Sequence, residues 1–122
     1  MTETNRPKPF SEFGDVYGFL EEVRLRPNMW VRDCSLLHLD SLLTGYRMAL
    51  GVHGIAEPFD FWTPGGESRF SEWLGRRLGR VSALGWAVEI EREAEREGRP
   101  AMGMFFELLD EFRVGRGTVV AG

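Results

Sequence analysis

The segment LLHLDSLLTGYRMAL, residues 36–50, has the clearest hydrophobic periodicity in the chain. Its large apolar residues recur every three or four positions, which places them on one side of an α-helix. These residues are Leu36, Leu39, Leu43, Tyr46 and Leu50. Asp33 or Ser35 can cap the start of this helix, and Gly51 and Gly54 mark its end. The segment therefore predicts a long amphipathic helix.

The flanking segments show the same spacing and predict four further helices. The first follows a cap at Ser11 and ends near Arg26, because Pro27 disfavours helical dihedrals in the residue before it. The others are expected over 68–81 with Ser68 as cap, over 82–97 starting at Ser82, and over 100–113. Apart from the C-terminal tail, no segment alternates apolar and polar residues as a strand does. The sequence predicts an all-α bundle of about five helices.

The chain has 122 residues, which is the size of a single domain. We expect a flexible N-terminus over 1–9, a helical domain over 10–113 and a Gly-rich tail over 114–122. A long loop is expected over 54–68, since this stretch contains two prolines and three glycines.

Composition restricts the function. The formal net charge of −4 argues against a dedicated nucleic-acid binder, because neutralising phosphates needs clustered Lys and Arg. Cys34 is the only cysteine, so no intrachain disulfide can form and a reducing cytoplasm is expected. Neither a signal peptide nor an apolar run of the ~20 residues that cross a bilayer is present. We expect a soluble, cytoplasmic protein.

The connection between the first two helices, RLRPNMWVRDCS over 24–35, contains three consecutive apolar residues after Pro27. We expect Trp30 to fold back and cover the end of the bundle, where burial of such a side chain contributes about 2 to 3 kcal/mol. The alternative is a ligand or partner pocket bordered by Arg26, Trp30 and Arg32.

Catalytic chemistry has weak support. Cys34 and His38 are four residues apart, and His53 lies beyond the end of the same helix. A nucleophile needs a base held by a third group, and a structural zinc needs four ligands. We therefore predict no catalytic residue, metal or cofactor, with a small thiol- or metal-dependent enzyme as the alternative.

Protein binding has two candidate surfaces. One is acidic and lies on the last two helices: Glu89, Glu93, Glu97, Glu107, Asp110 and Glu111. Such a surface could steer a basic protein, although solvated helix faces would look the same. The other is the aromatic part of the long loop, Phe59, Phe61 and Trp62, which could form an interface hot spot or fold inward. The basic stretch Arg69, Arg76, Arg77 and Arg80 is expected to contact the acidic helix or solvent.

The succession of RPNMWV, GYRMAL, FSEWLGRRLG, GWAVEI and FFELLDEFR resembles a group of small bacterial proteins, some of the immunity-protein type that accompanies polymorphic toxins. The resemblance covers about residues 12–113 and consists largely of packing residues. It implies a small cytoplasmic protein that binds and neutralises a cognate toxin without cofactor or turnover. It carries over no binding residues.

The first functional hypothesis is therefore a non-catalytic protein-binding module, an immunity protein. The alternatives are the small enzyme that uses Cys34, His38 and His53, and an accessory protein that forms a homodimer through an exposed apolar helix face.

Overall fold

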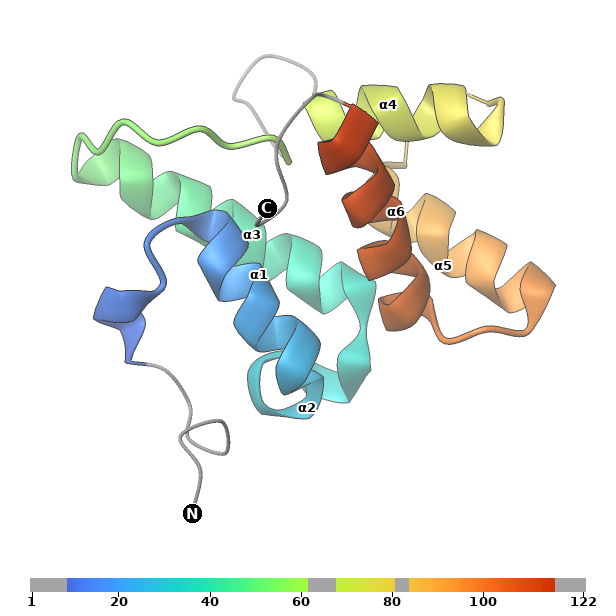
Figure 1. Cartoon of the computed structure of the whole chain (residues 1–122), viewed down its shortest axis with the longest axis horizontal. Helices are drawn as coiled ribbons and strands as arrows, with labels where there is room; N and C mark the ends of the chain where they lie inside the picture. Colours follow the sequence, from blue (N-terminus) through green and yellow to red (C-terminus); the bar gives the residue numbers. More distant parts are fainter. Residues whose placement is uncertain (1–8, 62–67, 81–83, 116–122) are drawn as a thin grey trace.

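The computed structural model describes residues 9–61, 68–80 and 84–115, which contain helices and turns and no strand (Figure 1). The α-helices are α1 (Val16–Leu25), α2 (Pro27–Trp30), α3 (Leu36–Val52), α4 (Arg69–Leu78), α5 (Trp86–Glu97) and α6 (Ala101–Gly115). Two short 3-10 turns, η2 (Phe10–Glu12) and η3 (Arg32–Cys34), precede α1 and α3. The all-α prediction is confirmed. The five predicted helices correspond to α1, α3, α4, α5 and α6, and the short α2 adds a sixth.

Local capping residues set most of the helix starts. Ser35, one of the two predicted candidates, caps α3, and Ser68 caps α4 as predicted, because each hydroxyl accepts from at least one free backbone N–H group of the first turn. The predicted cap at Ser11 is wrong. Asp15 caps α1 instead, and its carboxylate accepts from the N–H groups of Tyr17 and Gly18, both at 3.0 Å. Ser11 lies in η2, one turn earlier.

The ends of α5 follow from two glycines. The helix starts at Trp86 after Gly85, later than the predicted start at Ser82, which lies outside the described residues. It ends at Gly98, whose φ of 68° is a left-handed conformation that glycine adopts without steric cost. The last helix then runs to Gly115, two residues beyond its predicted end.

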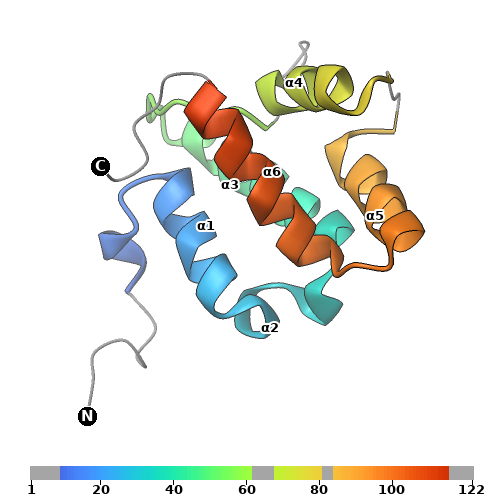
Figure 2. The ribbon, with the colours of Figure 1, turned by 45° about the vertical axis from the view of Figure 1, so that its right-hand side comes forward.

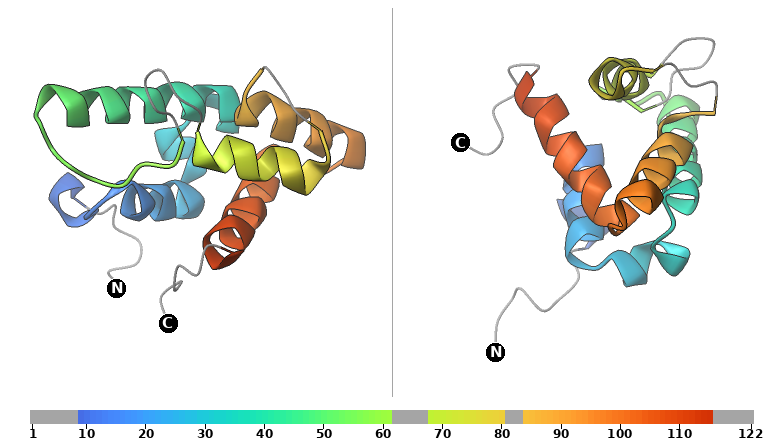
Figure 3. Two further views of the ribbon diagram at one scale, coloured as in Figure 1. Left: turned by 90° about the horizontal axis from the view of Figure 1, so that it is seen from above. Right: turned by 90° about the vertical axis from the view of Figure 1, so that its right-hand side faces the viewer.

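The helices surround one core. Helix α6 packs against α3, α4 and α5, and α3 also packs against α5. In Figure 2 α6 crosses the molecule between α1 and α5, with α4 above, and Figure 3 shows α3 along one edge. The core centres on aromatic rings, with Phe70 5.3 Å from Phe112 and Trp86 5.0 Å from Phe105 between centroids. Such pairs stabilise beyond their buried area by about 0.5 to 1.5 kcal/mol each.

Two carboxylates fasten the segment that follows α3. Glu57 accepts from the backbone N–H of Val16 at 2.8 Å and from the hydroxyl of Tyr46 at 2.9 Å. Burial and the neighbouring Glu57 raise the pKa of Tyr46, so its hydroxyl stays protonated and donates. Asp60 is buried and accepts from the hydroxyl of Tyr17. These bonds hold residues 57–60 against α1 and α3.

Trp30 is half-buried at the end of α2, in the connection between α1 and α3. Its ring lies 5.9 Å from Phe19 and 6.0 Å from Phe13, so it covers one end of the core as predicted. Arg26 forms an ion pair with Glu22 at 2.9 Å. Within the described residues, no helix is long and apolar enough to span a bilayer.

Leu→Ala replacements at a buried and at an exposed position of the same helix should show how much stability comes from burial, since both change helix propensity equally. Leu20 is 1% exposed and Leu25 is 69% exposed, and both lie on α1. We expect Leu20→Ala to lower the free energy of unfolding by about 2 to 5 kcal/mol, because it leaves a cavity. The matched Leu25→Ala should cost less than about 0.5 kcal/mol. Urea denaturation measures both, and equal losses would contradict this core.

Candidate protein-binding cleft

Arginines neutralise the acidic residues predicted to bind a partner. Asp110 pairs with Arg24 at 2.7 Å and Glu111 with Arg77 at 2.8 Å. Arg99 contacts both Glu107 and Glu97. Four of the six predicted residues are therefore already engaged by cations of the same chain. The prediction that the arginines near α4 contact the acidic helices is confirmed for Arg77 and for Arg80.

The remaining two, Glu89 and Glu93, are buried on α5. Arg80 reaches both, at 2.8 Å from Glu89 and 3.1 Å from Glu93. Hydrogen bonds from Arg96 and then from Arg80 hold the pKa of Glu93 below its usual range, although desolvation opposes them. These carboxylates therefore join α5 to the end of α4 and present little surface to a partner.

The aromatic loop turns inward. Phe61 is 2% exposed and lies 5.5 Å from Phe70 and 6.1 Å from Trp86. Phe59 is half-buried and stacks on Tyr46 at 6.0 Å. Trp62 lies outside the described residues. The inward alternative thus holds for Phe61, which fills the core and is not available to a partner in this structure.

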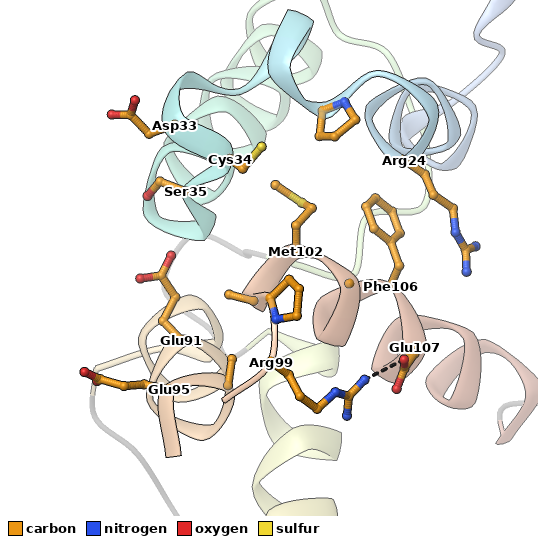
Figure 4. A pocket seen from close by; sticks show the side chains of 15 residues that line it. Arg24, Asp33, Cys34, Ser35, Glu91, Glu95, Arg99, Met102, Phe106 and Glu107 are labelled. Carbon is orange, nitrogen blue, oxygen red and sulfur yellow. Dashed lines mark ion pairs between the residues drawn. The ribbon is translucent and has the colours of Figure 1, made fainter. Parts of the chain in front are cut away.

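A cleft of about 890 Å³ opens between the connection preceding α3 and the helices α5 and α6 (Figure 4). Its apolar floor comes from Pro27 and Cys34 on one side and from Met102 and Phe106 of α6 on the other. Its volume is in the range of ligand and side-chain pockets, which combine apolar walls with a few placed polar groups. Sequence spacing does not reveal this cleft, because one wall lies within residues 24–35 and the other within 91–107.

Three carboxylates, Asp33, Glu91 and Glu95, lie along one wall. In the described parts of the chain none of them forms an ion pair, in contrast to the acidic residues of α6. Glu91 accepts the backbone N–H of Leu36 at 2.8 Å and so stabilises the start of α3. Asp33 and Glu95 are exposed and keep their full acceptor capacity.

The opposite wall carries Arg24 and Arg99, whose charges are balanced by Asp110 and Glu107. The hydrogen bond with Asp110 raises the pKa of Arg24, and the one with Glu107 raises that of Arg99. Uncompensated charge in the cleft is therefore negative and confined to the Asp33 side.

The backbone of that wall is strained. Asp33 and Cys34 have φ values of 58° and 53°, a left-handed conformation that costs a non-glycine residue about 1 to 2 kcal/mol. The reversal places Ser35 as the cap of α3 and brings Asp33 to the rim of the cleft.

The thiol and the histidines do not assemble into a site. The Cys34 thiol donates to the side-chain oxygen of Asn28 at 2.9 Å, and His38 Nδ1 lies 3.0 Å from the carbonyl oxygen of Arg32. His38 and His53 lie near opposite ends of α3, about 22 Å apart along its axis at 1.5 Å per residue. Among the residues that the structure describes, no three His, Cys, Asp or Glu side chains are grouped as metal ligands. Arg26 and Trp30 do not line the cleft, but Trp30 lines a separate groove of about 620 Å³ beside α3.

The Arg80 contacts predict a pH-dependent stability. Arg80→Met should lower the free energy of unfolding at pH 7, because two buried carboxylates lose their shared cation. The pKa of Glu93 is lowered by folding, so its stabilisation is present above the ordinary value of 4.5 and is lost as pH falls through the lowered value. The deficit should therefore shrink at pH 3.

Arg76→Met is the matched control, since Arg76 is exposed on α4 and makes no ion pair with any described residue. Its unfolding curve should match that of the wild type at both pH values. A deficit of Arg80→Met that is the same at pH 7 and pH 3 would rule out the electrostatic explanation.

Comparisons of the chain with protein families, curated proteins and solved structures find no match.

Proposed function

We propose that this chain is a non-catalytic protein-binding module, and that it neutralises a bacterial toxin by direct binding, without cofactor or turnover. The cleft between η3 and the helices α5 and α6 carries this proposal. It combines an apolar floor with a wall of carboxylates that no arginine of the described chain compensates. The partner class comes from the sequence resemblance.

The chemistry of the cleft favours a basic side chain beside an apolar one. A Lys or Arg of the partner can approach Asp33 and Glu95, while its neighbour covers Met102 and Phe106. The apolar contact removes surface from water, and each charge-assisted hydrogen bond contributes about 1.5 to 3 kcal/mol. The same arrangement disfavours an acidic partner.

The paired acidic residues of α5 and α6 suit this role less well. A basic partner would have to displace Arg80 from Glu89 and Glu93, or Arg77 from Glu111. Each exchange replaces one ion pair by another and so gains little free energy. Asp33 and Glu95 require no such exchange.

Binding at a basic surface also explains how a protein without catalytic groups could neutralise a toxin. An enzyme that acts on a phosphate-bearing substrate holds it with Lys and Arg. A carboxylate-lined cleft seated on those residues would occupy the surface that the substrate needs.

Co-expression tests the proposal directly. The chain is expressed with each protein encoded beside its gene, and cell survival and co-purification are measured. We expect one neighbour to be toxic alone and to be both tolerated and bound in the presence of this chain. If no neighbour forms a complex or loses toxicity, the chain is not an immunity protein.

Removal of charge from the cleft should weaken that complex. We expect the double variant Asp33→Asn and Glu95→Lys to lower affinity at least about tenfold, mainly through a slower association rate with a weaker salt dependence. Asn is chosen at position 33 because it tolerates the left-handed backbone there. Surface plasmon resonance at two salt concentrations measures both effects.

Glu72→Lys is the control, because it makes the same charge reversal as Glu95→Lys at a residue that is exposed on α4 and does not line the cleft. It should leave the affinity within about twofold of the wild type. An equal loss for Glu72→Lys and the cleft variant would indicate general charge steering and would exclude docking in the cleft.

A further inference from the structure

The outer face of α3 is exposed and uncharged. Its exposed side chains include Leu37, Ser41, Leu42, Gly45, Met48 and Val52. Met48 is 58% exposed and Val52 is 78% exposed. In Figure 3 α3 lies along an edge of the molecule, and no other described helix covers that side.

Such a face is unusual for a helix in water. On α1, α4, α5 and α6 the exposed residues include Asp, Glu or Arg, whereas no exposed position of α3 has a charged residue apart from the titratable His38. Single exposed apolar residues are ordinary, but a contiguous apolar stripe marks an interaction surface. The inner face of α3 is occupied by the core, and no helix of the described residues packs on the outer face (Figure 3).

The stripe is self-complementary about Gly45. If two copies of α3 cross in antiparallel directions with Gly45 on the two-fold axis, positions 42 and 48 of opposite chains meet, as do positions 41 and 49. Leu42 then packs on Met48, and small Ser41 lies against small Ala49. Small residues around the axis let the two helices approach closely, and the larger ones pack on either side. A two-fold axis makes each contact occur twice.

We propose that the outer face of α3 binds a second copy of this chain and forms an antiparallel homodimer centred on Gly45.

Charge favours a second copy over a charged partner at this face. Each chain has a net charge of −4, so two copies associate with the least repulsion where the facing surfaces are uncharged. The α3 stripe meets that condition, and it brings no like charges opposite each other. A basic partner would gain nothing from charge at this face and would be steered to the carboxylates of the cleft instead.

The apolar surface extends beyond the stripe. Phe10 is 75% exposed, and with Leu42 and Gly45 it lines a groove of about 620 Å³ beside the stripe. A standard interface buries roughly 800 Å² per partner, so a stable dimer would use the stripe and the groove together.

A charge at position 45 tests the dimer. Gly45 has a helical backbone, and a Cβ added there meets no atom within 4 Å. Gly45→Glu should therefore fold at least as stably as the wild type, since glycine is about 1 kcal/mol less favourable than most residues inside a helix. It places two carboxylates at the two-fold axis. We expect the dissociation constant of the dimer to rise at least about a hundredfold.

Gly103→Glu is the matched control, because Gly103 is also exposed and helical, on α6, with open space at its Cβ. Sedimentation velocity over a concentration series should give twice the mass of one chain for the wild type and for Gly103→Glu, and one chain for Gly45→Glu. A wild type that stays monomeric throughout, or a Gly45→Glu variant that dimerises as the wild type does, overturns the proposal.

Disulfide trapping tests the register in a Cys34→Ser background. Gly45→Cys should cross-link to itself, and Ser41→Cys should cross-link to Ala49→Cys in a mixture. Ser41→Cys alone should not, because its two copies would be about 12 Å apart along the helices, beyond disulfide reach. Self-cross-linking of Ser41→Cys with none at position 45 overturns this register. Both experiments use the isolated chain, so their outcome is independent of toxin binding.

Discussion

Helix α3 has apolar side chains around most of its circumference, and the rest of the molecule is arranged around that constraint. Its inner residues Leu36, Leu39 and Leu43 are fully buried and provide the surface on which α5 and α6 pack. An aqueous environment favours covering a helix on every apolar side. The part of the chain that the structure describes covers one side of α3 only. The proposed contact with a second copy would cover the other.

The charges of the chain are organised mainly between its own helices. Arg24, Arg77 and Arg80 each connect a helix or its end to an acidic residue on another helix. Exposed pairs of this kind contribute little stability one by one, but each arginine cancels locally the charge of the carboxylate that it contacts. The carboxylates that remain uncompensated in the cleft therefore dominate its local field. The net charge of the chain therefore does not tell which of its carboxylates lack a cationic partner.

The helices could be predicted from sequence because their causes are local. The spacing of leucines over 36–50, the Ser35 and Ser68 caps and the break at Pro27 all act within one or two turns. The cap at Asp15 was missed because Ser11 and Asp15 are both suitable residues, and only the packing of η2 decides between them. The sequence predicts only a connection over 24–35, whereas Pro27 starts the single turn of α2 there.

The candidate site was predicted poorly, because its parts are distant in sequence. Arg24 and Asp110 are separated by 86 positions, and nothing in either segment specifies their pairing. From the sequence alone, Asp110 and Asp33 are equally plausible as free acidic residues. The structure pairs Asp110 with Arg24 and places Asp33 in the cleft. Burial of Phe61 likewise depends on rings from α4, α5 and α6. The pattern within one segment shows that a residue is apolar or acidic. Whether that residue is buried or paired depends on contacts with segments that are distant in the sequence.

The two proposed surfaces differ in a way that lets one chain use both. No residue of the cleft belongs to the α3 stripe, so the two proposals rest on separate residues. An uncharged face cannot select a partner by electrostatics. In a two-fold dimer the selection would come from the shape complementarity of two identical faces. A carboxylate-lined cleft discriminates strongly, because an acidic protein is repelled before contact. Self-association through shape and partner selection through charge therefore need not compete for the same residues.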